Sequence, residues 1–244
     1  MLLACNDLTV SYHRHPAVHH LTCQFKLGTT TAIIGPNGAG KTTLIKALLG
    51  EIEPDSGRIT MHGILRKDIA YLPQIHNIDN MLPLTVADVV LLGSWYTMGL
   101  FHEVSAAAES QLGYCLAQVG LTGFNRRYIH ELSKGQLQRV LLAKIIMQQA
   151  SIIILDEPFN AMDMTTVAHL LELIRSWQKQ GKTVNAVLHD LHQVAKYFEY
   201  TMVLASRLVV YDKTTTVLTD PRLKDAYASR FVWHASDLCD ALDA

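Results

Sequence analysis

A glycine-rich segment, GPNGAGKTT, carries the residue types that bind phosphate. Gly35, Gly40, Lys41 and Thr42 fit the pattern GxxxxGK[ST], and the segment lies between an apolar run, TAII, and a helix-like stretch, TLIKALLG. Glycines without a Cβ and the N-terminus of the following helix let backbone N–H groups bind phosphate oxygens. We expect Lys41 to contact the β- and γ-phosphates of a nucleotide and Thr42 to bind Mg²⁺. The predicted nucleotide-binding residues here are Gly35, Pro36, Asn37, Gly38, Ala39, Gly40, Lys41, Thr42 and Thr43.

Two carboxylates follow a second apolar run, Ile152 to Leu155. A short, fully apolar run is typical of a central parallel strand, whose C-terminal end opens on the ligand site in α/β folds. We expect Asp156 to hold Mg²⁺ through water, and Glu157 to orient or deprotonate the attacking water. Alone, the run also fits a buried strand followed by two solvated acids. The glycine-rich segment favours the catalytic interpretation.

The elements that must position these groups form an α/β pattern. Alternating runs at Leu2 to Tyr12 and Leu21 to Leu27 predict an antiparallel β region, and TTTAIIG and GRITMHG predict further strands. From about Leu84 the pattern becomes helical, and strands return at SIIILDE, KTVNAVLHD and YTMVLAS. We therefore predict a single domain, with an α/β core at about 1–77 and 150–215. A helical subdomain is expected at about 78–149 and a C-terminal tail at about 216–244.

Composition favours an ordered enzyme and disfavours several other classes. The 244 residues are 49% hydrophobic and 18% charged, with a net charge of −1, so nucleic acid is not an expected partner. No tract reaches the length of a membrane span, and no basic, apolar leader is present, so we expect a cytoplasmic protein. Four cysteines, without a CxxC pair, suit reduced thiols: Cys5, Cys23, Cys115 and Cys239.

The segment LSKGQLQR, placed between the glycine-rich loop and LDEP, resembles the signature of the ATP-binding-cassette (ABC) family. The resemblance runs along essentially the whole chain and implies a P-loop NTPase core that hydrolyses Mg-ATP. It also implies a head-to-tail dimer, in which the signature of one copy faces the ATP held by the other. The implied signature contacts are Ser133, Lys134, Gly135 and Gln136.

Four further positions match functional residues of this family. The resemblance implies that Tyr12 stacks on adenine, although an ordinary strand tyrosine is the alternative. Gln74, in YLPQ, matches the residue that reaches the metal and the attacking water. His189, in VLHDL, matches the switch histidine on the γ-phosphate, and Asp163, in NAMD, matches the loop that crosses the dimer interface.

Lys134 departs from the family pattern, which usually reads LSGGQ. The lysine either points to solvent or adds a positive charge near the phosphates bound by the partner. The departure leaves open how strongly the dimer closes. It does not change the family resemblance.

The region after Gln74 resembles the ATPase subunits of bacterial zinc, manganese or iron importers, with zinc preferred. This resemblance implies a membrane permease as direct partner, an extracytoplasmic metal-binding protein as indirect partner, and a peripheral place on the cytoplasmic face of the inner membrane. Ile75 to Phe101 would form the dock for a permease helix. The matching residues are Asp79, Pro83, Thr85, Val86, Asp88, Val89, Val90, Leu91, Gly93, Gly99, Leu100, Phe101 and Phe159.

Two alternatives stay open. The first is a soluble ABC-type ATPase that acts on nucleic acid, ribosomes or a cluster-assembly scaffold, or an importer subunit for another small substrate. The second concerns a histidine group in YHRHPAVHH that could bind a transition metal. Because Pro16 is expected to mark a turn between strands and no carboxylate or cysteine completes the set, a role in metal regulation is the weaker interpretation. The histidines concerned are His13, His15, His19 and His20.

Overall fold

The computed structural model describes residues 2–12, 15–74, 83–95, 105–160 and 162–228. The strands are β1 (Leu2–Tyr12), β2 (His15–Gln24), β3 (Thr30–Ile34), β4 (Ser56–His62), β5 (Ile69–Leu72), β6 (Ile152–Asp156), β7 (Thr183–Val187), β8 (Tyr200–Ala205) and β9 (Arg207–Lys213). The helices are α1 (Lys41–Leu48), α2 (Val86–Leu91), α4 (Ala106–Gln118), α5 (Lys134–Gln148), α6 (Met164–Lys179), α7 (Leu191–Tyr197), α8 (Thr214–Thr219) and α9 (Pro221–Ala228). Short 3-10 turns are η1 (Arg66–Asp68), η3 (Leu92–Ser94) and η4 (Ile129–Glu131).

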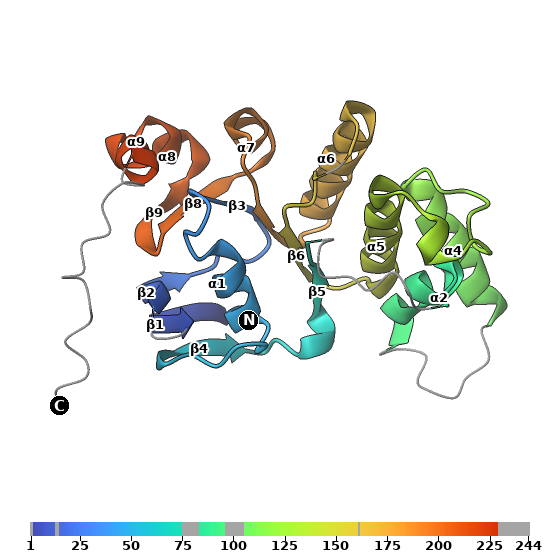
Figure 1. Ribbon diagram of the computed structural model, residues 1–244, viewed down its shortest axis with the longest axis horizontal. Helices are drawn as coiled ribbons and strands as arrows, with labels where there is room; N and C mark the ends of the chain where they lie inside the picture. Colours follow the sequence, from blue (N-terminus) through green and yellow to red (C-terminus); the bar gives the residue numbers. More distant parts are fainter. Residues whose placement is uncertain (1, 13–14, 75–82, 96–104, 161, 229–244) are drawn as a thin grey trace.

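The molecule has two lobes (Figure 1). The larger lobe contains a six-stranded sheet in the order β5-β6-β7-β3-β8-β9 and a three-stranded sheet in the order β2-β1-β4. Helix α1 lies between the two sheets, and α6 to α9 lie on the opposite side of the larger sheet (Figure 1). Helices α2, α4 and α5 form the smaller lobe. The predicted α/β core with an N-terminal antiparallel region and an inserted helical subdomain is confirmed.

Alternation along the central strands divides the larger lobe into two apolar cores. In β3, Ala32 and Ile34 pack toward the helices α5 to α7, whereas Ile33 packs toward α1 and the smaller sheet. Strands buried on both faces are expected to be apolar throughout, and β3, β6 and β7 are fully buried. Because β5, β6, β7, β3 and β8 run parallel, their C-terminal ends meet at one edge of the sheet.

Strand β2 begins earlier than the sequence pattern predicted. Pro16 was expected in a turn, but it lies within β2 and pairs with Ser11 of β1. A proline is tolerated there because β2 is an edge strand of its sheet, so its missing N–H removes no ladder hydrogen bond on the open side. The expectation of a turn at Pro16 was therefore wrong.

Several residues that carry the metal-importer resemblance stabilise helix α2 and its packing. The Thr85 hydroxyl accepts from the Asp88 N–H at 3.2 Å, and the Asp88 carboxylate accepts from the Thr85 N–H at 2.8 Å, which together cap the helix. Val86 and Val90 are fully buried in the smaller lobe. At Gly93, an added Cβ would lie 2.3 Å from the Lys144 carbonyl oxygen of α5. The remaining matches at Asp79, Gly99, Leu100 and Phe101, and much of the expected dock, lie outside the described residues.

The segment that follows residue 216 is partly built into the larger lobe. Helices α8 and α9 pack beside β8 and β9, and Val217, Leu223 and Ala226 are buried in the apolar core. Within the described ranges, no helix is long and apolar enough to cross a membrane.

Candidate functional site

The glycine-rich loop joins β3 to α1, so its backbone opens on the C-terminal edge of the large sheet. Gly35, Gly38 and Gly40 all have positive φ angles, of 149°, 79° and 85°. A Cβ at Gly35 would lie 2.0 Å from the Leu204 carbonyl oxygen, and one at Gly40 would lie 2.1 Å from the Ala17 carbonyl oxygen. Gly38 has open space around it. Two of the glycines are therefore required by packing inside the protein as well as by phosphate approach.

Lys41 is held in place by the loop that surrounds it. Its side chain is 6% exposed, and its Nζ donates to the carbonyl oxygens of Gly35 and Pro36, both at 2.8 Å. Asn37 and Gly38 at the tip of the loop are exposed, whereas Ala39 and Thr43 are buried. This arrangement positions the ammonium at the N-terminus of α1, where anions are favoured.

Asp156 ends β6 and lies beside the loop and the end of β5. Its carboxylate is fully buried, Gln74 Nε2 donates to Oδ1 at 3.5 Å, and Oδ2 has no partner among the described residues. Burial raises the pKa of Asp156, and hydrogen bonding by the Thr42 hydroxyl opposes the rise. The predicted metal-binding residues Thr42, Gln74 and Asp156 are therefore brought together.

These oxygen donors fit Mg²⁺. A buried carboxylate oxygen without a partner, next to a threonine hydroxyl, matches the hard oxygen ligands that Mg²⁺ prefers when substrate phosphates and water complete its shell. Within the described part of the chain, no cluster of three His, Cys, Asp or Glu side chains could hold a metal by itself. So sparse a set of protein ligands would suit Mg²⁺ that is held by protein and nucleotide together.

Glu157 sits at the mouth of the site in a strained backbone conformation, with φ of 52°. Its Oε1 lies 3.0 Å from His189 Nε2, and its Oε2 accepts from Asn160 Nδ2 at 2.6 Å. Partial burial alone would raise the pKa of Glu157, but the hydrogen bonds from His189 and Asn160 outweigh it and lower the pKa below its ordinary value. The structure thus holds an ionised carboxylate where a base is predicted.

Residues of the signature lie at the N-terminus of α5, in the other lobe. Ser133 Oγ accepts from the Gln136 N–H at 3.2 Å, and Gln136 Oε1 accepts from the Ser133 N–H at 3.0 Å. Lys134 is exposed, as one of its two interpretations requires, and Gly135 is half-buried. Ser133 and Gln136 thus bond to each other, and among the described residues no side-chain hydrogen bond joins the signature to Asp156 or Glu157.

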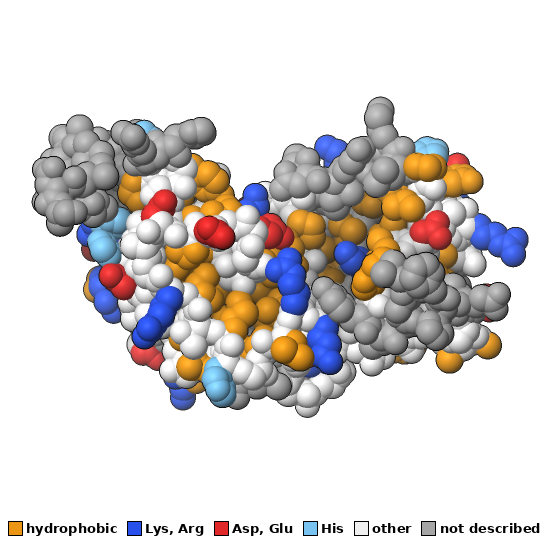
Figure 2. All heavy atoms as spheres, turned by 90° about the horizontal axis from the view of Figure 1, so that it is seen from below, with side chains coloured by type: hydrophobic (Ala, Val, Ile, Leu, Met, Phe, Trp, Pro, Cys, Tyr) orange, Lys and Arg blue, Asp and Glu red, His pale blue; other side chains and the backbone are white. Residues whose placement is uncertain are grey.

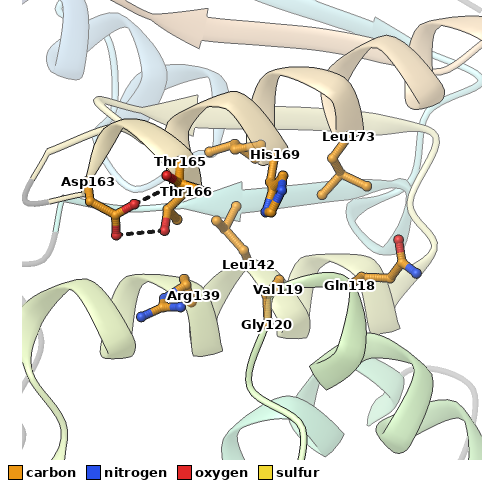
Figure 3. A pocket seen from close by; sticks show the side chains of 11 residues that line it. Gln118, Val119, Gly120, Arg139, Leu142, Asp163, Thr165, Thr166, His169 and Leu173 are labelled. Atoms are coloured by element: carbon orange, nitrogen blue, oxygen red, sulfur yellow. Dashed lines mark hydrogen bonds between the residues drawn. The ribbon is translucent and has the colours of Figure 1, made fainter.

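Asp163 caps α6 and borders a cleft between the lobes (Figure 3). Its carboxylate accepts from both the N–H and the hydroxyl of Thr166, each at 2.9 Å, which lowers its pKa. The cleft has a volume of about 300 Å³, and Arg139 and Leu142 of α5 face α6 across it (Figure 3). Among the described residues, no hydrogen bond joins the Asp163 side chain to Glu157, Asn160 or His189, and its predicted place at a dimer interface stays a prediction.

A second groove lies next to Gln74. It has a volume of about 510 Å³ and joins the end of α1, strand β5 and helix α5. Lys144 is half-buried in it, and burial lowers its pKa. Figure 2 shows a face of the molecule on which hydrophobic side chains alternate with single basic and acidic side chains, without a continuous basic patch. The groove is lined by Lys46, Glu51, Arg66, Ile69, Tyr71, Pro73, Lys144 and Gln148.

Tyr12 and the histidine group lie on the smaller sheet. Tyr12 ends β1 and is 45% exposed, so its ring is available to stack on a base. His19 is buried and its Nδ1 accepts from Arg207 Nε at 3.0 Å, whereas His20 Nδ1 lies 2.7 Å from Asp7 Oδ1. Each of the two imidazoles therefore uses a ring nitrogen to contact another side chain of the protein. His13 lies outside the described residues, and His15 is exposed.

Sequence reasoning missed two residues of the site. Asn160, three residues after Glu157, holds its carboxylate, and Gln138 of α5 donates to the Pro158 carbonyl oxygen at 3.2 Å. Asn160 lies at a spacing that allows a turn, which is a weak local signal. Gln138 follows the signature in sequence, but only the packing of the two lobes places it beside Pro158.

Comparisons with known proteins agree with the motifs. A sequence model described as "ABC transporter" matches residues 18–160. The manganese transport system ATP-binding protein MntB of Listeria monocytogenes is 41% identical over 225 residues, which cover 90% of this chain and 93% of that protein. The zinc transport system ATP-binding protein TroB of Treponema pallidum is 35% identical, with coverage of 92% and 86%. A metal-chelate type ABC transporter, solved in an inward-facing conformation, has a TM-score of 0.77 and 27% identity, with coverage of 91% and 87%.

Proposed function

The chain belongs to the ABC transporter family as its ATP-hydrolysing subunit, and from this premise we propose that it powers movement of a divalent metal ion through a membrane permease. The observation that carries the proposal is the meeting of Lys41, Gln74, Asp156, Glu157 and His189 at one edge of the parallel sheet. Their chemistry supplies phosphate binding, metal binding and a base in one place.

Each group has a role that follows from its geometry. Lys41 and the N-terminus of α1 bind the β- and γ-phosphates of ATP. Thr42, Asp156 and Gln74 would hold Mg²⁺, which when bound would neutralise charge on the phosphates. Glu157, ionised and fixed by His189 and Asn160, accepts the proton of the attacking water. The exposed His189 ring is placed to contact the γ-phosphate while it holds Glu157.

We propose a second copy of the chain as one partner. The Ser133 to Gln136 turn is capped within α5 and lies in the other lobe from the hydrolytic groups, so a nucleotide from another copy is its natural ligand. A helix N-terminus of this kind favours a phosphate. The head-to-tail arrangement follows, because each copy then contributes Lys41 to one ATP and Ser133 to the other.

The second partner is a permease subunit, bound beside Gln74. The groove between β5 and α5 combines apolar and charged side chains, which suits a helix end from another protein. It lies directly beside the residue that contacts Asp156, so occupancy of the groove and metal binding can influence each other. The remaining dock residues, including Leu82, lie outside the described residues. An extracytoplasmic binding protein would supply the cargo from the far side of the membrane.

The cargo is proposed as a divalent transition metal. Zinc was the preference from the sequence resemblance, but the relatives reported above are named for manganese and for zinc, so manganese and zinc are both tested first. The alternative of a soluble ABC ATPase on nucleic acid gains no support from the mixed charges in Figure 2.

The decisive experiment measures both assembly of the chain with a permease and metal transport by the complex. The chain is co-expressed with a candidate permease, purified from membranes, and reconstituted into vesicles with a candidate metal-binding protein. We expect Mg-ATP-dependent uptake of labelled manganese or zinc, abolished by Glu157→Gln. ATP hydrolysis without membrane association or metal uptake would overturn the transport proposal and leave the ATPase assignment standing.

A further inference from the structure

Gln138 is a buried polar side chain on the otherwise apolar face of α5. Its side chain is 1% exposed. Burying an amide is unfavourable unless its polar atoms find partners, so its presence calls for a specific interaction. Its buried neighbours on α5 are Leu137, Val140, Leu141, Leu142, Ala143, Ile145 and Met147.

The amide makes one hydrogen bond, and that bond crosses between the lobes. Gln138 Nε2 donates to the carbonyl oxygen of Pro158 at 3.2 Å. Pro158 directly follows Glu157, whose φ of 52° makes the loop sensitive to its anchors. Gln138 itself lies five residues after Ser133, about 7.5 Å along the helix at the ordinary helical rise. The bond therefore joins the signature end of α5 to the loop that carries the base.

The surrounding packing makes this bond important. One residue further on, Arg139 borders the cleft that separates α5 from α6, and Leu142 borders it one turn later (Figure 3). On that side, α5 is not packed continuously against the larger lobe. The Gln138 side chain is therefore one of the contacts that join α5 to the Glu157 loop beside this cleft.

Stability alone does not account for the residue. The Oε1 atom of Gln138 is buried and has no partner among the described residues. A half-satisfied buried amide is no better for stability than an apolar side chain of the same size. An apolar residue at this position is therefore expected to be tolerated by the fold.

We propose that Gln138 is a positioning residue that couples the two nucleotide sites of the dimer. Nucleotide held on a second copy engages the Ser133 end of α5, and the Gln138–Pro158 hydrogen bond passes that engagement to Glu157 of the same chain. This inference rests on the proposed ATPase dimer.

The test uses the full-length chain and compares two glutamines of the smaller lobe. Gln138→Met keeps the length and volume of the side chain but removes the hydrogen bond. Gln111→Met is the control, because Gln111 is half-buried on α4 and its Nε2 donates within that helix, to Cys115 Sγ at 3.9 Å. ATP hydrolysis is measured against ATP concentration, with Mg-ADP affinity by calorimetry and thermal unfolding in parallel.

For Gln138→Met we expect kcat to fall about 3- to 10-fold, the effect of one neutral hydrogen bond, and the Hill coefficient to fall toward about 1. Mg-ADP affinity and the melting temperature should stay at wild-type values, because Lys41 and the apolar core are untouched. Gln111→Met should leave kcat and the Hill coefficient unchanged.

Two results would overturn the inference alone: wild-type kcat and cooperativity in Gln138→Met, or an equal loss in Gln111→Met. Should Gln138→Met fail to fold, Gln138→Leu provides the same comparison. Absence of hydrolysis in the wild-type chain would overturn the proposed ATPase dimer and the coupling role together.

Discussion

The two lobes satisfy their polar groups in different ways. In the larger lobe, the functional side chains contact one another across several elements: Gln74 reaches Asp156 from β5, and His189 reaches Glu157 from the end of β7. In the described part of the smaller lobe, the side chains of Ser133 and Gln136 each bond to the backbone of the other, within one turn of α5. The larger lobe therefore presents an assembled hydrolytic site, and the smaller lobe presents a capped helix end available to an external ligand.

The difference has a topological cause. The C-terminal ends of parallel strands meet at one edge of the sheet, so residues far apart in sequence lie close together there. A helix N-terminus has no such neighbours and must satisfy its N–H groups locally or with a ligand. If the comparison is right, substitutions in the larger lobe alter nucleotide binding and chemistry in each chain. Substitutions at the helix end leave nucleotide binding by a single chain unchanged and alter the hydrolysis that two chains carry out together.

The largest effect is expected for the base. Glu157→Gln should reduce kcat by about 10²- to 10⁴-fold, the range for loss of general-base catalysis, while Mg-ATP binding is retained. Steady-state hydrolysis at saturating ATP and calorimetry with Mg-ATP measure the two quantities. With hydrolysis blocked, ATP-bound dimer should accumulate in size-exclusion chromatography.

Glu172→Gln serves as the control, because Glu172 is exposed on α6 and pairs only with Arg175 at 3.5 Å. Its hydrolysis rate should equal that of the wild type. A wild-type rate in Glu157→Gln would instead assign the base to another residue.

Removal of the phosphate lysine should have the next largest effect. Lys41→Ala deletes a charge-assisted contact of about 1.5 to 3 kcal/mol, so the Kd for Mg-ATP should rise by about 10- to 150-fold. Calorimetry on the isolated chain measures it. Lys46→Ala, in the last turn of the same helix, removes the same charge away from the loop and should leave the Kd unchanged. Equal affinities for Lys41→Ala and the wild type would contradict the phosphate role.

A smaller effect is expected in the pH profile. The hydrogen bonds to Glu157 lower its pKa below the ordinary value, so the base is ionised at neutral pH and the acid limb of kcat/KM, which reports the free enzyme, lies at acid pH. Asn160→Ala removes the 2.6 Å hydrogen bond to Oε2, which should raise the pKa and move the limb to higher pH. Rates at pH 7.5 should be similar, because the carboxylate is ionised in both proteins.

The profile is recorded over the range in which circular dichroism shows both proteins folded. An acid limb at the same pH in the variant would mean that Asn160 does not set the ionisation of Glu157. A loss of rate at pH 7.5 with no shift of the limb would point to orientation of the carboxylate instead.

Local signals in the sequence predicted the strands and loops that carry the site better than they predicted the contacts between its side chains. Apolar runs before Gly35 and Asp156 predicted two strands correctly, because strands buried on both faces need continuous apolar residues. Pro16 was misassigned to a turn, since its tolerance depends on β2 being an edge strand, which only the sheet order shows.

Contacts between distant elements could not be predicted from the sequence. Gln138 reaches Pro158 because α5 packs on the larger lobe at a particular rotation, and no spacing within α5 encodes that rotation. The explanation of the loop glycines was also incomplete. Gly35 and Gly40 are constrained by carbonyl groups of Leu204 and Ala17, which lie far away in sequence.

The smallest effect, and the sharpest test of the comparison, is expected at the helix end. Ser133→Ala removes the N-cap of α5 and should cost about 1 kcal/mol of unfolding free energy, or about 2 to 4 °C in melting temperature. Its Kd for Mg-ATP, measured at protein concentrations at which the chain is monomeric, should stay within about twofold of the wild type, because Ser133 does not contact Lys41 or Asp156 in its own chain. Hydrolysis at concentrations that favour the dimer should fall.

Ser133→Asp restores a side-chain acceptor and the melting temperature, but its negative charge would face the phosphates of the partner's ATP, so hydrolysis should remain low. A weakened Mg-ATP affinity in monomeric Ser133→Ala would show that the signature acts within one chain, and full hydrolysis in Ser133→Asp would show that no phosphate approaches this helix end.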